Sequence, residues 1–140
     1  MSDWRAFCRG AERISVDGDS GVLVIAGDRR QRVEIRETPD TYELMSIVVR
    51  PSAVASVPDV PLRAWRRNRG LQNVGFRIDV KGRLVGEAWV PKAGLSRDEF
   101  LLSVRRCASE CDLFEFQACG KKTSARTHLM CGSLNQSLQP

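Results

Sequence analysis

Residues 73–115 read NVGFRIDVKGRLVGEAWVPKAGLSRDEFLLSVRRCASECDLFE, and the elements predicted within this stretch decide the fold. Over residues 74–79 apolar side chains alternate with glycine or charged ones, which predicts a half-buried strand. Gly82 supplies the positive φ of a tight turn, and residues 83–90 return as the partner strand. Because Pro91 ends the second strand, this part of the sequence predicts a β-hairpin.

The second half of the stretch has the signature of a long helix. Ser96-Arg97-Asp98-Glu99 matches a capping box, in which the serine and glutamate side chains satisfy the first free amides of a helix. We expect this helix to span residues 96–115. Its apolar side chains recur at helical spacing on one face, namely Phe100, Val104, Cys107, Ala108, Cys111 and Phe114.

The first half of the chain predicts an antiparallel meander. Residues 2–10 suit a short helix. Alternating apolar residues and turn residues then predict four strands, over residues 14–17, 22–26, 32–36 and 42–49. The connections are too short for crossover helices, so neighbouring strands run antiparallel. Val33 and Ile35 are expected on the buried face.

A loop and a helix are expected to join the meander to the hairpin. Residues 51–61 contain three prolines among small residues, which predicts a connecting loop. Residues 62–69 suit a helix with Leu62 and Trp65 turned inward and Ala64 as a further candidate for that face. The predicted fold is therefore α+β, an antiparallel meander plus a hairpin packed with helices, and not a doubly wound parallel sheet.

The length of 140 residues fits one domain. We expect the domain to span residues 1–117 and residues 118–140 to form a flexible C-terminal tail, because the hydrophobic pattern fades there. No stretch approaches the 18 apolar residues of a membrane span, and the first residues have no apolar core of the signal-peptide kind. The expected location is the cytoplasm, away from membranes.

Several short segments around the hairpin carry a family resemblance. They are VGFRID at 74–79 after a helix ending at Asn68, KG at 81–82, LVGEA at 84–88, VP at 90–91, GLS at 94–96, EF at 99–100 and CD at 111–112. A looser match lies in RQRV at 30–33 and in the strand ending near Ser46. With these segments the chain resembles the type III secretion chaperone-like superfamily and, within it, the bacterial YbjN-type domains.

This resemblance implies a sheet-and-helix fold, frequent homodimers and binding of extended segments of client proteins. Many YbjN-type members have no assigned role. The chain departs from secretion chaperones in two respects. It carries a net charge of +5 where those chaperones are typically acidic, and its first predicted helix is short.

Enzymatic chemistry is not indicated. His128 is the only histidine, and it falls in the expected tail. A flexible tail would not hold a histidine at the fixed distance from a nucleophile that catalysis requires. The adjacent carboxylates Asp98 and Glu99 sit at a helix start, where the helix dipole explains them. No glycine-rich phosphate loop precedes a helix, so no cofactor is expected.

A zinc site is one alternative. Cys107, Cys111, Cys119, His128 and Cys131 cluster in the last third of the chain, and four such ligands could close a tetrahedral site. The spacing is not that of repeated CxxC pairs. Cys107 and Cys111 also lie on the apolar helix face, where cysteine packs as a small hydrophobe. We therefore expect no metal and reduced thiols.

Nucleic-acid binding is the other alternative. Residues 61–106 hold eleven Lys/Arg against four Asp/Glu, and four arginines flank Trp65 on one predicted helix: Arg63, Arg66, Arg67 and Arg69. Such charge attracts either phosphates or an acidic protein. No nucleic-acid-reading motif accompanies it, and a solvated helix face explains it equally well.

The preferred hypothesis is a non-catalytic, chaperone-like domain that forms a homodimer and binds a protein or extended peptide. Both faces of the predicted hairpin carry apolar residues, so the face away from the long helix needs cover from a helix, a second subunit or a client. The expected partner-binding residues are Trp89 and Val85, with Trp65, Arg66 and Arg67 nearby.

Overall fold

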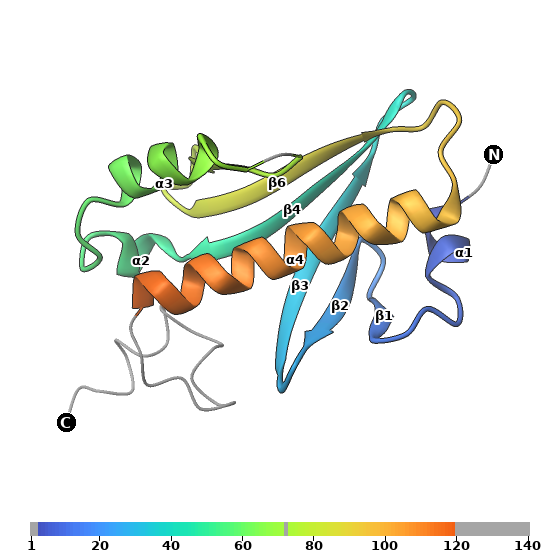
Figure 1. Ribbon diagram of the computed structural model, residues 1–140, viewed down its shortest axis with the longest axis horizontal. Coiled ribbons are helices and arrows are strands. Elements are labelled where there is room, and N and C mark those ends of the chain that lie inside the picture. Colours follow the sequence, from blue (N-terminus) through green and yellow to red (C-terminus); the bar gives the residue numbers. More distant parts are fainter. Residues whose placement is uncertain (1–2, 72, 120–140) are drawn as a thin grey trace.

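A computed structural model describes residues 3–71 and 73–119 of the chain (Figure 1). In chain order the elements are α1 (Trp4–Cys8), β1 (Ile14–Asp17), β2 (Gly21–Ala26), β3 (Arg29–Glu37), β4 (Thr41–Val49), α2 (Pro51–Val54), α3 (Val60–Asn68), β5 (Gly75–Ile78), β6 (Leu84–Pro91) and α4 (Arg97–Cys119). The expected meander, hairpin and long helix are present, and the α+β class is confirmed. The tail expected over residues 118–140 begins inside α4, and residues 120–140 lie outside the described part.

The strands form one antiparallel sheet of six, in the order β1-β2-β3-β4-β6-β5. Short turns connect each of the first four strands to the next, so β1, β2, β3 and β4 are consecutive both in sequence and in the sheet. The chain then passes through α2 and α3, enters the edge strand β5 and returns as β6 between β5 and β4. The hairpin therefore extends the meander into a single sheet.

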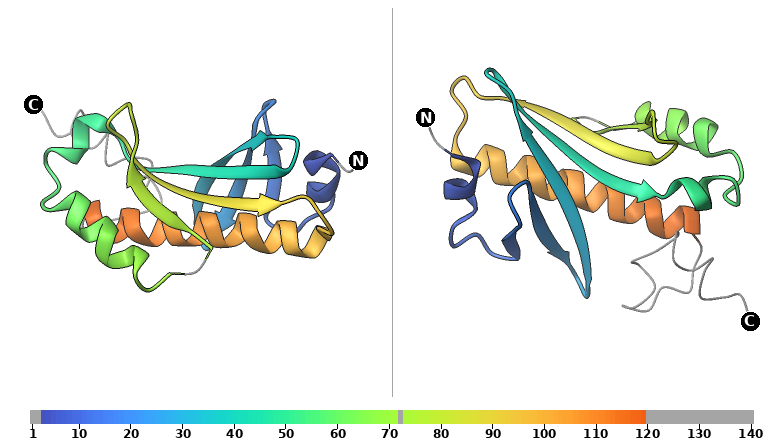
Figure 2. Two further views of the ribbon diagram at one scale, coloured as in Figure 1. Left: turned by 90° about the horizontal axis from the view of Figure 1, so that it is seen from above. Right: turned by 180° about the vertical axis from the view of Figure 1, so that it is seen from behind.

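Helix α4 runs across one face of this sheet, which we call the inner face (Figures 1 and 2). It packs against β2, β3, β4 and β6. The predicted apolar stripe is fully buried there, with Phe100 between Phe7 and Tyr42 at ring-centroid distances of 5.2 and 5.3 Å. Val33 and Ile35 are buried beneath the helix, as their alternation predicts.

The capping box forms as expected. The backbone amide of Ser96 donates a hydrogen bond to Glu99 Oε2 at 2.9 Å, and the amide of Glu99 donates to Ser96 Oγ at 3.2 Å. Hydrogen bonds from the backbone amide and the side chain of Ser96 lower the pKa of the Glu99 carboxyl. The helix continues to Cys119, beyond the expected end at residue 115. No helix in the described part of the chain is long and apolar enough to span a membrane.

The segment between meander and hairpin differs from the prediction. Residues 51–61, expected as a loop, contain α2 and the start of α3. The inward residues of α3 are Val60 and Ala64, whereas Leu62 and Trp65 are exposed. The reason is the earlier start of the helix. Val60 and Ala64 are one turn apart, so they form the stripe that packs inward and leave the larger side chains outside.

The C-terminal half of α4 buries two carboxylates. Asp112 forms an ion pair with Arg29, in which Oδ2 of Asp112 lies 2.8 Å from Nη2 of Arg29. Burial, together with the neighbouring charge of Asp112, raises the pKa of Glu115 to about 8. Glu115 is therefore mostly protonated at neutral pH, which avoids a second negative charge in the same buried region.

Helix α4 and the sheet pack closely at Gly86 in β6. A Cβ atom placed on Gly86 would lie 2.3 Å from the Sγ of Cys111 and 2.8 Å from Cε1 of Phe76. The ring of Phe76 in turn packs edge-on against Phe114 of α4, with centroids 4.9 Å apart. A side chain at this position would have to displace the thiol of Cys111 and the ring of Phe76, so the packing favours glycine.

We predict that Gly86→Ala lowers the free energy of unfolding by about 1–3 kcal/mol, the usual cost of overpacking a core. Gly75→Ala in the neighbouring strand is the matched control, because a Cβ there meets no atom within 4 Å. Urea unfolding of both variants makes the comparison. Adding Cys111→Ala to Gly86→Ala should recover part of the loss, and an unchanged stability of Gly86→Ala would contradict the packing described.

Candidate functional site

The face of the sheet turned away from α4, here called the outer face, has no helix lying across β3 and β4 within the described residues (Figure 2, right). On β4 the side chains of Glu43, Met45 and Ile47 alternate with the buried residues of the inner face. The outer face is thus open to solvent over the middle of the sheet.

The outer face combines ion pairs with exposed apolar side chains. Three cross-strand or same-strand pairs lie on it, namely Arg36–Glu43, Arg77–Glu87 and Arg32–Glu34. Between them Ile25, Ile47 and Trp89 are exposed, and Trp89 is the most exposed of these at 66%. Paired charges leave little net charge on this face, so its apolar residues are its main means of attracting a partner.

Trp89 also lies next to a free sheet edge. In register it faces Glu43 of β4, while β5 pairs with β6 only as far as Gly75 opposite Glu87. Residues 88–91 of β6 therefore have β4 on one side and, among the described residues, no strand on the other. Such an edge can accept an added strand from another chain.

Val85 does not share the exposure of Trp89. Its side chain is completely buried, at 0% exposed, so the expectation that the hairpin displays it is wrong. Val85 lies between Ile47 of β4 and Arg77 of β5 in register, and neighbours on both sides enclose it. Its part in partner binding is therefore at most the support of this face.

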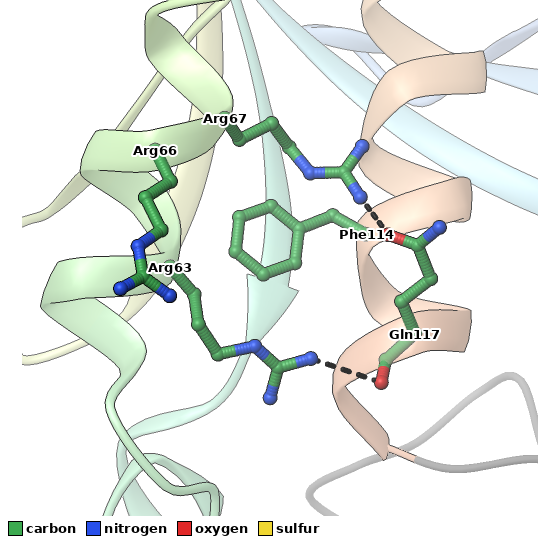
Figure 3. Close-up of a pocket in the computed structure, with 5 residues that line it drawn as sticks. All are labelled: Arg63, Arg66, Arg67, Phe114 and Gln117. Carbon is green, nitrogen blue, oxygen red and sulfur yellow. Dashed lines mark hydrogen bonds between the residues drawn. The ribbon is translucent and has the colours of Figure 1, made fainter.

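A second candidate surface is a recess between α3 and α4, here called the arginine pocket (Figure 3). Its volume is about 370 Å³, and it is lined by Arg63, Arg66, Arg67, Phe114 and Gln117. The three guanidinium groups are arranged around the ring of Phe114. Two of the predicted partner-binding residues, Arg66 and Arg67, lie in this pocket.

Contacts with α4 hold two of these arginines. Arg63 Nη2 donates to the backbone oxygen of Gln117 at 3.0 Å, and Arg67 donates to the side-chain oxygen of the same residue. The guanidinium carbon of Arg67 lies 4.7 Å from the centre of the Phe114 ring. Burial lowers the pKa of Arg67, the positive charge of Arg63 adds to this, and Glu110 opposes it.

The structure does not bring all the predicted site residues together. Trp65 is 56% exposed on α3, near the arginine pocket. This pocket lies at the C-terminal end of α4, where Gln117 accepts a hydrogen bond from Arg63. Trp89 lies toward the other end of the molecule, close to Pro91, from which the chain leads into the start of α4. The predicted residues therefore divide between two surfaces.

The basic residues do not form one nucleic-acid face. Arg97 bonds the backbone of Phe7 at the first turn of α4, and Arg105 bonds the backbone of Glu12 further along. Arg77 pairs with Glu87, and other cations pair with nearby acids at separate places, as in Arg83–Asp79 and Lys92–Glu37. This dispersal removes the main support for nucleic-acid binding.

The zinc alternative fails at the helix cysteines. Cys107 and Cys111 are free thiols, and both are fully buried against the sheet. Burial raises the pKa of Cys111 well above its usual value, which disfavours the thiolate that binds metal. His128 and Cys131 lie outside the described residues. Among residues 3–71 and 73–119 no cluster of His, Cys, Asp or Glu could hold a metal ion.

Sequence reasoning missed Ile47 and Gln117. Alternation from the buried Tyr42 would have placed Ile47 on the outer face, so that signal was present. Gln117 had no such signal, because its role depends on α4 continuing past residue 115 and on α3 lying beside it.

Comparison with protein-family models and with curated proteins finds no match. Solved structures do match. A chain of the complex between the Yersinia pestis type III secretion chaperone SycH and a fragment of YscM2 aligns over 80% of this chain and 99% of that chain, with a TM-score of 0.51 and 7% identity. The architecture of the sheet and helices is the same. The fold is type III secretion chaperone-like.

Two further complexes share this chaperone-like fold. A chain of the ExsC–ExsE complex aligns over 80% of this chain and 87% of its own length, with a TM-score of 0.52 and 14% identity. A chain of the ExoU–SpcU complex from the type III secretion system of Pseudomonas aeruginosa aligns over 80% and 92%, with a TM-score of 0.50 and 16% identity. At these identities the likeness establishes the fold, and the YbjN-type resemblance stays a prediction.

Proposed function

We propose that this chain is a non-catalytic, chaperone-like domain that holds an extended segment of a client protein on the outer face of its sheet. The observation that carries the proposal is the exposure of Trp89 on a sheet face that no described helix crosses. A large aromatic side chain left in water costs free energy that a bound partner recovers, and tryptophan is enriched among the residues that dominate interfaces.

The geometry around Trp89 supports an extended partner. The unpaired edge of β6 offers backbone hydrogen bonds, and the apolar side chains of the outer face offer places for alternate side chains of an added strand. The matched structures support the same class of function, since each is a complex of two proteins. A chain with one histidine, outside the described residues, gives no support to a catalytic role.

We predict that Trp89→Ser strongly reduces client capture from extracts of the native cell, with the retained proteins quantified by mass spectrometry. Retention should fall about tenfold or more, because removal of a central aromatic anchor typically costs at least that much affinity. Val80→Ser is the matched control, because Val80 is an apolar residue fully exposed in the β5–β6 turn. It should retain the same proteins as the unmodified chain.

A nuclease treatment separates protein clients from nucleic acid in the same experiment. Retention that survives nuclease and depends on Trp89 supports the proposal. Equal retention by Trp89→Ser and Val80→Ser, or material that nuclease removes, contradicts it.

We also propose that the chain forms a homodimer through the exposed face of α3. Leu62 and Trp65 lie about one helical turn apart and are both largely exposed, although each carries a large apolar side chain. Such a pair on a short helix is a ready contact for the same helix of a second copy, as two-fold symmetry requires.

Light scattering after size-exclusion chromatography tests the dimer. We predict that the unmodified chain elutes as a dimer and that Trp65→Glu elutes as a monomer, because the charge cannot be buried at the interface. Leu102→Glu, which changes an exposed leucine of α4, should remain dimeric. A monomeric unmodified chain or a dimeric Trp65→Glu variant would refute this interface.

A further inference from the structure

The arginine pocket holds more positive charge than the described chain neutralises. Its three arginines are permanently charged. The one acid paired with them is Glu110, at 3.7 Å between its Oε2 and Nη1 of Arg67. Arg66 makes no ion pair within residues 3–71 and 73–119. Two positive charges therefore remain without a negative partner at the mouth of one recess.

This charge is held in place. Gln117 accepts hydrogen bonds from Arg63 and Arg67 through two different oxygens, which fixes both side chains around Phe114. Stacking on the Phe114 ring further restricts Arg67, whose side chain is only 18% exposed. Side chains that are already fixed lose little conformational freedom when an anion binds. The arrangement of Arg63 and Arg67 therefore favours binding of an anion.

The segment after α4 brings no acidic side chain to the pocket. Residues 120–140 contain Lys121, Lys122 and Arg126 and no aspartate or glutamate. The pocket is therefore suited to an anion from another molecule.

We propose that the arginine pocket binds a phosphate monoester. Such a group carries a charge of about −1.5 to −2 at neutral pH, which matches the two uncompensated positive charges. Its three terminal oxygens can accept hydrogen bonds from three guanidinium groups, whereas a single carboxylate offers two oxygens and one charge. The pocket volume of about 370 Å³ also leaves room beside the phosphate for the organic group that carries it.

The same chemistry can be presented by a free small phosphate ester or by a phosphorylated side chain of a protein. In both cases the arginines contact the phosphate oxygens. This binding does not depend on the client site around Trp89, which lies toward the other end of the molecule.

Titration of the full chain with phenyl phosphate, followed by calorimetry and by NMR, tests the proposal. We expect saturable binding at one site, weakened about tenfold by Arg66→Gln, because one charge-assisted contact is lost. Arg66 is exposed, so its replacement should leave the fold intact. Arg106→Gln removes an equal charge from the exposed side of α4 and should bind phenyl phosphate as the unmodified chain does.

Two further probes complete the test. Benzoate, with the same ring and a single charge, should bind at least about tenfold more weakly than phenyl phosphate, since it leaves one guanidinium unsatisfied. A phosphoserine peptide that binds more tightly than phenyl phosphate assigns the pocket to phosphorylated proteins, and the reverse order assigns it to free esters. The proposal is overturned if neither phosphate probe saturates, if benzoate binds as tightly, or if Arg106→Gln weakens binding as much as Arg66→Gln.

Discussion

The close packing of α4 on the sheet at Gly86 is the contact on which the rest of the structure depends. Gly86 stands opposite Ser46 in register, and the thiol of Cys111 occupies the space that a side chain on Gly86 would take. The buried Gln31 donates a hydrogen bond to Ser46 Oγ at 2.6 Å, so these two polar side chains under the helix are partnered. This close packing lets α4, a helix of 23 residues, lie along the inner face of the sheet from the end near α1 to its own C-terminal end.

The two candidate surfaces follow from this single-helix cover. Helix α4 packs only on the inner face. The outer face is therefore left without a helix over β3 and β4 within the described residues, and Trp89 stays in water. Because α4 extends to Cys119, its last turns lie within reach of α3, and Gln117 can hold Arg63 and Arg67. The surface for an extended client and the anion pocket are thus separate consequences of one packing arrangement.

The sequence predicted the features that rest on local patterns. Alternation, the glycine turn and the capping box are each encoded within a few residues, so the hairpin and α4 could be recognised before any contact was known. The phase of α3 could not, because Val60–Ala64 and Leu62–Trp65 are both apolar pairs, and packing decides between them. The burial of Val85 and the arginine pocket depend on elements distant in the chain, which no local pattern reports.

Amide hydrogen exchange of the chain, alone and with a captured client, is the most direct test of the central claim that the outer face holds a client segment. We predict slower exchange on binding along residues 88–91 of β6, where the sheet edge is free, with little change in α3 and the end of α4. Protection confined to α3 and the C-terminal turns of α4, with β6 unchanged, would contradict it.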